Sequence, residues 1–595
     1  MTFEFGPFKL DETGRALRRG AHDIQLQPRA FDLLVYLVRN RARMVPKDEL
    51  LAAVWPGVTV TDNSLQRAIS LIRKELREGG LDDAIRNFSG KGYRFCVDSG
   101  STDSAAAAGD AAADDLAAAR RAVTEQRWRD AVSCYGHIDH NCALGGADLD
   151  RWALALQCLG KPSQAIPVHV RAVAAHTQAG ERDAAANAAT ALSMLHLERG
   201  EAALAKGWLA RAEDLVADAG QSPAQGRILW MKGRIAAADG NPQQALAFAE
   251  AAYEFGRQNA DLYVEALGLV YRGFFRLSLG DTVAGLADQD HAAALALSNR
   301  IDPVASSTLY CNILWACRTF GDWARANQWT LGYQRFCTDS SMEFSGSCQL
   351  HRAEVLGIRG SLSEALARID DSFGRLTDDA PWALGDAHRV RGDVLSAIGD
   401  DEAAFSAYEK AYALGWCPEP GPAMLLLERG EAEAACTSLE RSLIGQSWWT
   451  LQRQGVLLAH LALAAAQAGR RERAEGLIGD LAGHAERWPM PSIRAITNEA
   501  AAVLAVARQA PEDALRRLHL ARQLWTSIDS RFHATRLRLQ IADLQLATAD
   551  PRGAMTELRA ACAGADELGS RKLRVKCEAL QRRLDALGAE DALRA

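Results

Sequence analysis

The chain has two kinds of hydrophobic pattern. The first, over residues 1–98, predicts short strands, then short helices, then two more strands. Near the start, brief apolar runs end at Glu12-Thr13-Gly14 and at Arg19-Gly20. Runs of this length, bounded by turn residues, are typical of short strands joined by tight turns. Their apolar members are Phe3, Phe5, Phe8, Leu10, Leu17, Ile24 and Leu26.

Three amphipathic segments follow and predict three helices. Pro28 suits the first turn of the first helix, and Pro56 ends the second. Asp62 caps the third helix, which Gly79-Gly80 ends. The three apolar faces consist of Phe31, Leu34 and Val38, of Leu50, Leu51 and Val54, and of Leu65, Ile69, Ile72 and Leu76. Residues 85–97 then predict two strands around a turn that contains glycine.

The outward face of the third helix is polar and basic. It presents Asn63, Gln66, Arg67, Ser70, Arg73, Lys74 and Arg77, and the hairpin adds Arg86, Lys91 and Arg94. In a DNA major groove, Arg can form two hydrogen bonds with guanine, Asn and Gln can do so with adenine, and basic residues hold phosphates. A basic helix face is also common where a surface only contacts water, so this face alone leaves both interpretations open.

The order of these elements resembles the winged-helix effector domain of the OmpR/PhoB type. The most specific stretches are residues 62–70 (DNSLQRAIS), 72–76 (IRKEL) and 90–95 (GKGYRF), and the resemblance covers about residues 3–97. It implies that the third helix enters the major groove and that the hairpin, or wing, touches the adjacent minor groove or backbone. It also implies that the loop before the third helix, Gly57 to Thr61, contacts RNA polymerase.

Carried over residue by residue, the resemblance assigns DNA contacts to two groups. The recognition helix would use Asn63, Ser64, Gln66, Arg67, Ser70, Arg73, Lys74 and Arg77, and the wing Arg86, Asn87, Lys91 and Arg94. Two features depart from the family. Leu71 stands where many relatives carry a basic residue, which weakens the expected phosphate contacts. No phosphoacceptor receiver domain precedes the winged helix, so we expect the input signal to come from elsewhere.

A run of small and polar residues follows the winged helix. Residues 99–114 offer almost nothing to bury, which predicts a flexible linker, with an exposed loop inside one domain as the alternative. We therefore divide the chain into a winged-helix domain over 1–98, a linker over 99–114 and a helical array over 115–595.

The second hydrophobic pattern, after the linker, is an Ala-rich helical repeat with a period of about 40 residues. Its markers are glycines 160, 200, 240, 280, 321, 360, 399, 430 and 469, with Gln126, Gln509 and Ala549 at equivalent places, so twelve helix pairs are predicted. Five positions after every marker stands Ala or Gly, as at Ala165 and Ala404. A glycine accepts the left-handed conformation of a turn, and a small residue lets two helices approach closely.

The unit over residues 399–411 resembles a tetratricopeptide repeat at its turn and second helix. The resemblance implies a tetratricopeptide-like array, and we expect an extended, curved solenoid with a concave groove that binds a ligand or a protein. The spacing of 31 between Gly399 and Gly430 predicts a shortened unit and a kink. The predicted fold class is an α+β winged helix followed by an all-α superhelical solenoid.

The charge differs between the two parts. Residues 1–98 hold 16 Lys and Arg against 13 Asp and Glu, whereas the remainder holds 52 against 62, so the formal net charge of −7 describes neither part. We find no apolar run long enough to span a membrane and no secretory signal, and the 12 Cys lie scattered. These features predict a cytoplasmic protein that does not bind membranes.

Aromatic residues concentrate in the first half of the array. Residues 253–344 hold 14 of the chain's 40 aromatics, and rigid aromatic surface is common in binding sites. We expect an effector or partner contact at Tyr271, Phe274, Phe275, Trp315, Trp323, Trp329 and Tyr333. The alternative is that these side chains only fill the core between repeats.

Metal and enzyme sites are not favoured. Cys134, His137, His140 and Cys142 offer zinc-binding groups, but they do not share one helix face, so we expect no metal and no cofactor. Cys311 and Cys317 would form a redox pair only if the chain folded back between them. No phosphate-binding loop, H-E-x-x-H or G-x-S-x-G motif occurs, and we expect no enzyme activity.

Together these patterns predict a DNA-binding transcription regulator whose array senses a ligand or protein partner. We expect double-stranded DNA as the main partner, with a homodimer on DNA as one arrangement. The alternative is an interaction scaffold whose winged helix contacts protein instead of specific DNA.

Overall fold

The computed structural model describes residues 2–20, 22–41, 43–55, 62–81, 84–88, 92–97, 114–139, 143–218, 222–298, 300–343, 345–444 and 448–594. The chain forms two compact units, residues 1–115 and 116–595. Residues 99–113 of the predicted linker lie outside the described residues.

The N-terminal unit begins with a four-stranded antiparallel sheet in chain order. Its strands are β1 (Thr2–Phe5), β2 (Phe8–Asp11), β3 (Ala16–Arg19) and β4 (His22–Ile24). Alternate residues point to the core because side chains alternate across a strand. Phe5, Phe8, Leu10 and Leu17 are the buried members, and Phe5 meets Phe95 edge to face with ring centres 4.9 Å apart.

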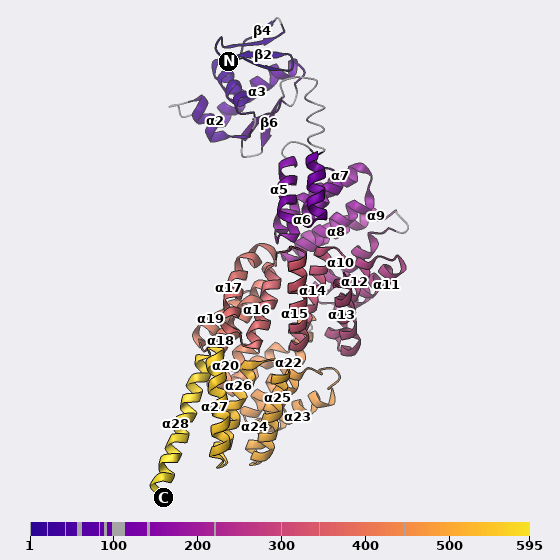
Figure 1. Cartoon of the computed structure of the whole chain (residues 1–595). Coiled ribbons are helices and arrows are strands. Elements are labelled where there is room, and N and C mark those ends of the chain that lie inside the picture. The colour runs from indigo at the N-terminus through magenta and orange to yellow at the C-terminus, as the bar shows by residue number, and fades with distance from the viewer. Residues whose placement is uncertain are drawn as a thin grey trace. The chain divides into compact units, whose positions relative to one another are not determined.

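Three helices pack against this sheet's core and against a second, smaller sheet (Figure 1). They are α1 (Pro28–Arg39), α2 (Lys47–Val54) and α3 (Asp62–Glu78). The second sheet has the order β5 (Val45–Pro46), β7 (Gly92–Phe95), β6 (Ile85–Phe88). Gly92 is required there, because a Cβ on it would lie 2.1 Å from the carbonyl oxygen of Val45. The predicted order of strands, three helices and a C-terminal hairpin is confirmed.

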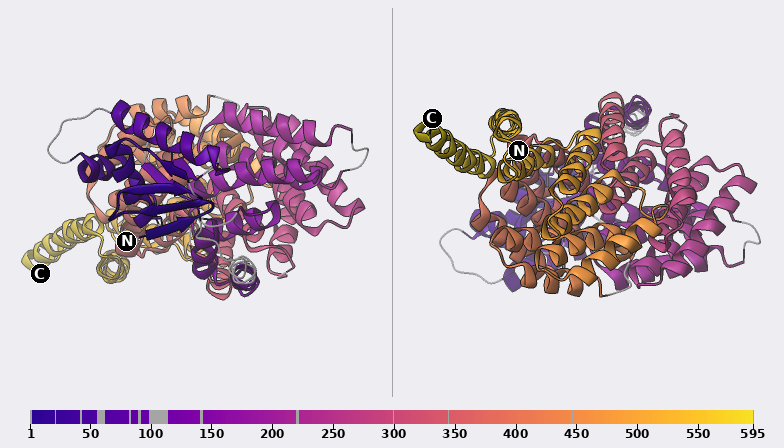
Figure 2. Two further views of the ribbon diagram at one scale, coloured as in Figure 1. Left: turned by 90° about the horizontal axis from the view of Figure 1, so that it is seen from above. Right: turned by 90° about the horizontal axis from the view of Figure 1, so that it is seen from below.

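The second unit consists of antiparallel helix pairs and a final single helix. The pairs are a helix over 114–124 with α5 (Trp128–Asp139), α6 (Gly146–Cys158) with α7 (Pro162–Ala179), α8 (Arg182–Glu198) with α9 (Ala202–Val216), α10 (Gln225–Ala238) with α11 (Pro242–Gln258), α12 (Leu262–Leu279) with α13 (Thr282–Ala296), α14 (Pro303–Phe320) with α15 (Trp323–Asp339), α16 (Gly346–Arg359) with α17 (Leu362–Asp379), α18 (Leu384–Ile398) with α19 (Asp401–Ala413), α20 (Gly421–Glu428) with α21 (Ala432–Ser442), α22 (Trp448–Gln467) with α23 (Arg471–Gly483), α24 (Pro491–Ala507) with α25 (Pro511–Ser527), and α26 (Arg531–Ala547) with α27 (Pro551–Leu568). The last helix, α28 (Arg571–Arg594), projects away from the others in Figure 2.

Every marker of the repeat lies at the turn inside a helix pair and has a left-handed backbone. Its φ ranges from 55° at Gln126 to 102° at Gly399, and Ala549, with φ of 60°, adopts the same conformation without being glycine. The alanines five positions after the markers are fully buried, for example Ala165 and Ala404 at 0% exposure. The close helix approach predicted from the small residues is therefore present, and the all-α tetratricopeptide-like solenoid is confirmed.

The array is more compact than the extended solenoid that the repeat predicts. Successive turns of the superhelix touch, since α22 packs against both α12 and α14. Ser492 donates to the carbonyl oxygen of Gly321 over 2.7 Å, although 171 residues separate them, and Ser570 donates to that of Ala397 over 2.6 Å. Helices far apart in the sequence consequently lie in contact along the interior of the solenoid.

The unit between Gly399 and Gly430 is short because its first helix, α20, has only 8 residues. Among the described residues, no helix is long and apolar enough to cross a membrane. Cys134 and His137 lie on α5, whereas His140 and Cys142 lie outside the described residues.

Candidate functional site

Helix α3 separates cleanly into a buried and an exposed face. Leu65, Ile69, Ile72 and Leu76 are at most 2% exposed and belong to the core of the N-terminal unit. Gln66, Arg67, Ser70, Lys74 and Arg77 are exposed, and Ser64 is half-buried. The side chain of Asn63 lies outside the described residues. The spacing of apolar residues thus leaves a polar and basic face available for contact along the length of the helix.

Arg73 belongs to the predicted DNA-contacting set but already has a structural partner. Its guanidinium donates to the carbonyl oxygen of Ile85 from Nε over 3.1 Å and from Nη2 over 2.8 Å. Ile85 begins β6, so these two hydrogen bonds fasten α3 to the wing. The helix and the wing therefore hold a fixed relative orientation.

The wing carries two arginines directly opposite each other. Arg86 on β6 pairs in register with Arg94 on β7. Arg86 and Asn87 are exposed, whereas Arg94 is half-buried and its Nε donates to the carbonyl oxygen of Arg41 over 3.1 Å. Like charges at opposed positions destabilise a strand pair, and an anion between them relieves the repulsion. Lys91 and the segment Gly57 to Thr61 lie outside the described residues.

Most of the aromatic residues singled out in the array fill its core. Tyr271, Phe274, Phe275, Trp315 and Tyr333 are at most 5% exposed. Trp323 and Trp329 are half-buried, and Trp329 and Phe336 line an open surface pocket of about 640 Å³. The structure thus places five of the seven in packing positions, which is the alternative that the sequence left open.

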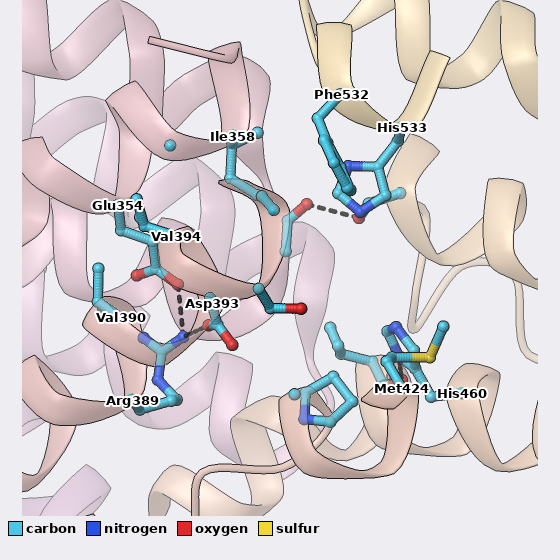
Figure 3. A pocket seen from close by; sticks show the side chains of 18 of the residues that line it. Glu354, Ile358, Arg389, Val390, Asp393, Val394, Met424, His460, Phe532 and His533 are labelled. Carbon is cyan, nitrogen blue, oxygen red and sulfur yellow. Dashed lines mark hydrogen bonds and ion pairs between the residues drawn. The ribbon is translucent and has the colours of Figure 1, made fainter. Parts of the chain in front are cut away.

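A cavity of about 240 Å³ lies inside the C-terminal half of the array. The first helices of successive pairs, from α14 to α26, and α28 surround it, and its lining mixes apolar side chains with many ionisable ones. In Figure 3, Glu354, Arg389 and Asp393 lie on one side of the cavity, and Met424, His460 and His533 lie on the other. Among the described residues this is the cavity with the densest set of buried charged groups that we find.

The sequence contains a signal for this cavity that the glycine period alone does not give. In some units, ionisable residues stand 6, 10, 13 or 16 positions before the marker, and these positions share one helix face. Examples are Asp393, Arg389 and Asp386 before Gly399, and Arg536 and His533 before Ala549. The unit that ends at Gly280 carries Phe274, Val270, Leu267 and Val264 at these positions. The number of ionisable residues on this face therefore differs from unit to unit.

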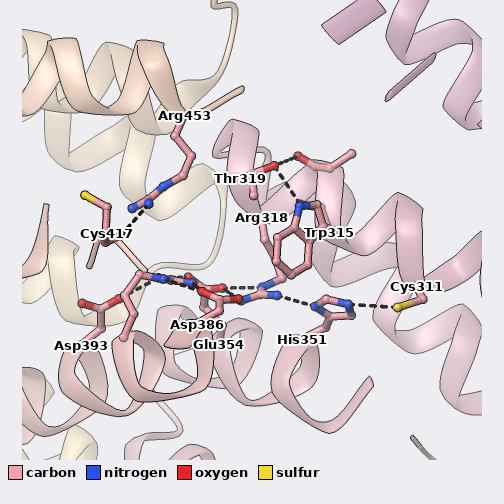
Figure 4. A network of polar contacts seen from close by, with 12 residues as sticks. Cys311, Trp315, Arg318, Thr319, His351, Glu354, Asp386, Asp393, Cys417 and Arg453 are labelled. Carbon is pink, nitrogen blue, oxygen red and sulfur yellow. Dashed lines mark hydrogen bonds and ion pairs between the residues drawn. The ribbon is translucent and has the colours of Figure 1, made fainter. Parts of the chain in front are cut away.

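A buried ion network forms one wall of the cavity (Figure 4). Arg318 pairs with Glu354 and, over 2.9 Å, with Asp386. Arg389 pairs with Asp386 and Glu354 over 2.7 Å each and with Asp393 over 2.9 Å. Two arginines thus serve three carboxylates, which is the pairing that buried charges require.

The carboxylates of this network differ in how easily they ionise. Burial opposes ionisation of Asp386, but Arg389 and Arg318 outweigh it and hold the pKa of that carboxyl below its usual range. Burial raises the pKa of Asp393 to about 6, against the opposing charge of Arg389. Tyr408 donates to Asp393 over 2.8 Å. The network extends to His351, which contacts Arg318 through Nδ1 and lies 3.3 Å from the sulfur of Cys311 through Nε2.

Two histidines and an arginine form the opposite wall. His460 on α22 has its Nδ1 2.8 Å from the carbonyl oxygen of Val456. His533 on α26 lies 2.9 Å from the hydroxyl of Ser530 and stacks on Trp525, with ring centres 4.1 Å apart. Arg536 pairs with Glu499 over 2.7 Å. We call His460, His533 and Arg536 the imidazole corner.

Comparison with known proteins concerns the N-terminal unit. Residues 21–95 match the family model described as "Transcriptional regulatory protein, C terminal". The transcriptional regulatory protein YvcP of Bacillus subtilis is 39% identical over 75 residues, which are 12% of this chain and 32% of YvcP. The phosphate regulon transcriptional regulatory protein PhoB of Escherichia coli is 31% identical over 93 residues, 16% of this chain and 41% of PhoB. The chain thus spans less than half the length of these relatives.

A solved structure matches the same unit. It is the DNA-binding domain of Klebsiella pneumoniae RstA in complex with the RstA box, at 32% identity over 16% of this chain and 96% of that chain, with a TM-score of 0.14. The family match and the two relatives confirm the predicted OmpR/PhoB-type domain.

Proposed function

Because residues 21–95 form a domain of the transcriptional regulatory protein C-terminal family, we propose that this chain is a transcription regulator. In this proposal α3 recognises a promoter sequence in the major groove, and the helical array receives the signal. The observation that carries the proposal is the exposed polar face of α3, with Gln66 and Arg67 at its N-terminal half. Residues of this type at the start of a recognition helix bond base edges.

The wing supplies the second contact in this proposal. The opposed arginines Arg86 and Arg94 form a small positive site that suits one backbone phosphate. Arg73 keeps α3 and the wing in register, so a base contact and a phosphate contact occur together. Lys74 and Arg77 would hold phosphates at the C-terminal end of α3.

The array provides the input in this proposal. Its cavity is a more suitable ligand site than the buried aromatic cluster, because a ligand can enter a cavity without displacing core side chains. A bound ligand would change how the array docks or associates with a second copy, and so bring two winged helices onto adjacent half-sites. We propose a non-enzymatic, cytoplasmic regulator of this kind.

The experiment that tests the function compares two arginine variants of the full-length protein. Arg67→Ala removes an exposed side chain of α3, whereas Arg18→Ala removes an exposed arginine of β3 that pairs with Asp23 over 2.7 Å. We expect Arg67→Ala to weaken discrimination at one base pair by about 1–3 kcal/mol and Arg18→Ala to leave it unchanged. If neither the wild type nor either variant selects a DNA sequence, the scaffold alternative replaces this function.

A further inference from the structure

The chemistry of the array cavity indicates what class of molecule it takes. We propose that the cavity binds a small organic carboxylate with an apolar body, and that the imidazole corner holds the carboxylate and takes up a proton as it binds. The inference rests on the proposed sensing role of the array and deepens it by naming the ligand class.

The first argument comes from the hydrogen-bonding state of His460. A backbone carbonyl oxygen only accepts hydrogen bonds, so the Nδ1 that lies 2.8 Å from the oxygen of Val456 carries the hydrogen. In a neutral ring, Nε2 then carries no hydrogen and can only accept a hydrogen bond. A carboxylate oxygen is also an acceptor, so it can bond Nε2 only if one proton is added between them.

The second argument comes from the electrostatic field in the corner. Burial first, and then the charges of Arg536 and Arg453, lower the pKa of His460 to about 4 against the hydrogen bond with Val456. Burial, Arg536 and His460 also hold the pKa of His533 well below its ordinary value. Burial chiefly, and the positive potential of nearby arginines to a smaller extent, keep the two imidazoles of the corner neutral. A carboxylate is attracted by that potential, and its charge restores the basicity of the imidazoles, whereas an amine is repelled.

The carboxylates that line the cavity are paired with basic residues. Glu499 on α24 pairs with Arg536, and Glu428 on α20 pairs with Lys572 on α28 over 2.6 Å. Asp393 on α18 pairs with Arg389. Glu499 and Glu428 each pair with a basic residue, whereas Arg389 is shared by Asp393, Asp386 and Glu354. The charged groups that line the cavity are Arg318, Glu354, Asp386, Arg389, Asp393, Glu428, Arg453, Glu499, Arg536 and Lys572.

The third argument is the apolar lining next to the corner. Phe532 adjoins His533, and Met424, Val394 and Ile358 also line the cavity (Figure 3). These side chains suit a hydrocarbon or aromatic body instead of a sugar or a phosphate. A volume of about 240 Å³ lies below the usual range of drug-sized sites, so the ligand is small.

The test uses three near-isosteric probes and the full-length protein. Benzoate, benzamide and benzamidine share one ring and differ in charge as anion, neutral molecule and cation. By calorimetric titration at pH 7 we expect benzoate to bind with a Kd of about 1 mM or tighter, roughly tenfold or more below the other two. Equal binding of the three probes, tighter binding of benzamidine, or no binding of benzoate up to that concentration overturns the proposal.

Proton uptake gives a readout that needs no variant. Titration of benzoate in phosphate and in Tris should give different apparent enthalpies, which report protons taken from the buffer. The Kd should rise by up to about tenfold per pH unit between pH 6 and pH 8, the limit for one linked proton. Equal enthalpies in the two buffers together with a flat pH profile contradict the proposal.

Two variants locate the site. His460→Gln and His533→Gln should each weaken benzoate binding by roughly tenfold, while His519→Gln, on the outer helix α25, should not. An equal loss in all three variants contradicts the assigned corner. If the protein selects DNA but does not bind benzoate, only this inference fails, and if it binds benzoate but selects no DNA, only the proposed function fails.

Discussion

Arg73 and Ile85 are joined by two hydrogen bonds, from Nε and Nη2 of the guanidinium to one carbonyl oxygen, at 3.1 and 2.8 Å. They fasten the recognition helix α3 to the first strand of the wing. A residue that the helix pattern assigns to the DNA-contacting face therefore also sets the geometry of that face. This relation makes the wing and α3 one rigid reading surface.

Removing the two hydrogen bonds between Arg73 and Ile85 should make the wing more flexible. Arg73→Gln shortens the side chain and removes its two-pronged donation to Ile85, which we expect to cost about 1–2 kcal/mol locally. Hydrogen exchange followed by mass spectrometry on the full chain should show faster exchange over residues 85–95. Lys74→Gln, at an exposed neighbouring position, is the matched control and should leave that segment unchanged. Equal exchange in the two variants would mean that these hydrogen bonds do not order the wing.

Base contacts and phosphate contacts should respond differently to salt. Gln66→Ala should change which base is preferred and leave the slope of log affinity against log salt almost unchanged. Lys74→Ala should weaken binding to all sequences and make the slope shallower by about 1. Binding titrations at several salt concentrations measure both effects. The same change of slope in both variants would show that α3 does not lie in the groove as assigned.

Replacing Ala549, which has a left-handed backbone, with glycine should stabilise the array. Its φ of 60° is costly for a residue with a Cβ, so Ala549→Gly should stabilise the array by up to about 1 kcal/mol. Ala563→Gly, at an exposed position inside α27, should destabilise it by about 1 kcal/mol. Thermal unfolding of the two variants should shift in opposite directions. A shift in the same direction would contradict the assigned turn.

The stability of the array should depend on pH through His176. Burial alone would lower the pKa of this ring, but hydrogen bonds with Glu181 at 2.5 Å and Asp150 at 2.8 Å outweigh burial and raise it. A raised pKa in the folded state stabilises the fold below the unfolded value of about 6.5, and this contribution disappears as the pH rises through the folded pKa. The unfolding temperature should therefore fall from pH 6 to pH 8 more steeply in the wild type than in His176→Gln. Identical pH dependence in the two proteins would exclude this role.

Local spacing predicts the elements of this chain well. The intervals between Leu65, Ile69, Ile72 and Leu76 give the orientation of α3, and the period of about 40 residues places turns even at Gln126 and Ala549, where no glycine marks them. Both predictions depend on neighbours within one helix pair or one helix. Contacts of that range leave a periodic trace in the sequence.

Contacts over longer range are not visible in this way. The hydroxyl of Ser492 and the carbonyl of Gly321 meet across 171 residues, and such contacts make the array more compact than the repeat alone predicts. The aromatic residues around Phe274 gave a binding prediction, yet the structure buries most of them. The ionisable residues that surround the cavity come from six or more units, so they become one site only after the superhelix has closed.

The most direct test of the central claim is selection of binding sites from a random double-stranded DNA pool by the full-length protein. We predict enrichment of one defined sequence by the wild type and altered preference at a base pair within it for Gln66→Ala, with Arg18→Ala enriching the same sequence as the wild type. Recovery of no common sequence by the wild type, or of the same sequence by wild type and Gln66→Ala alike, would contradict recognition of DNA through α3.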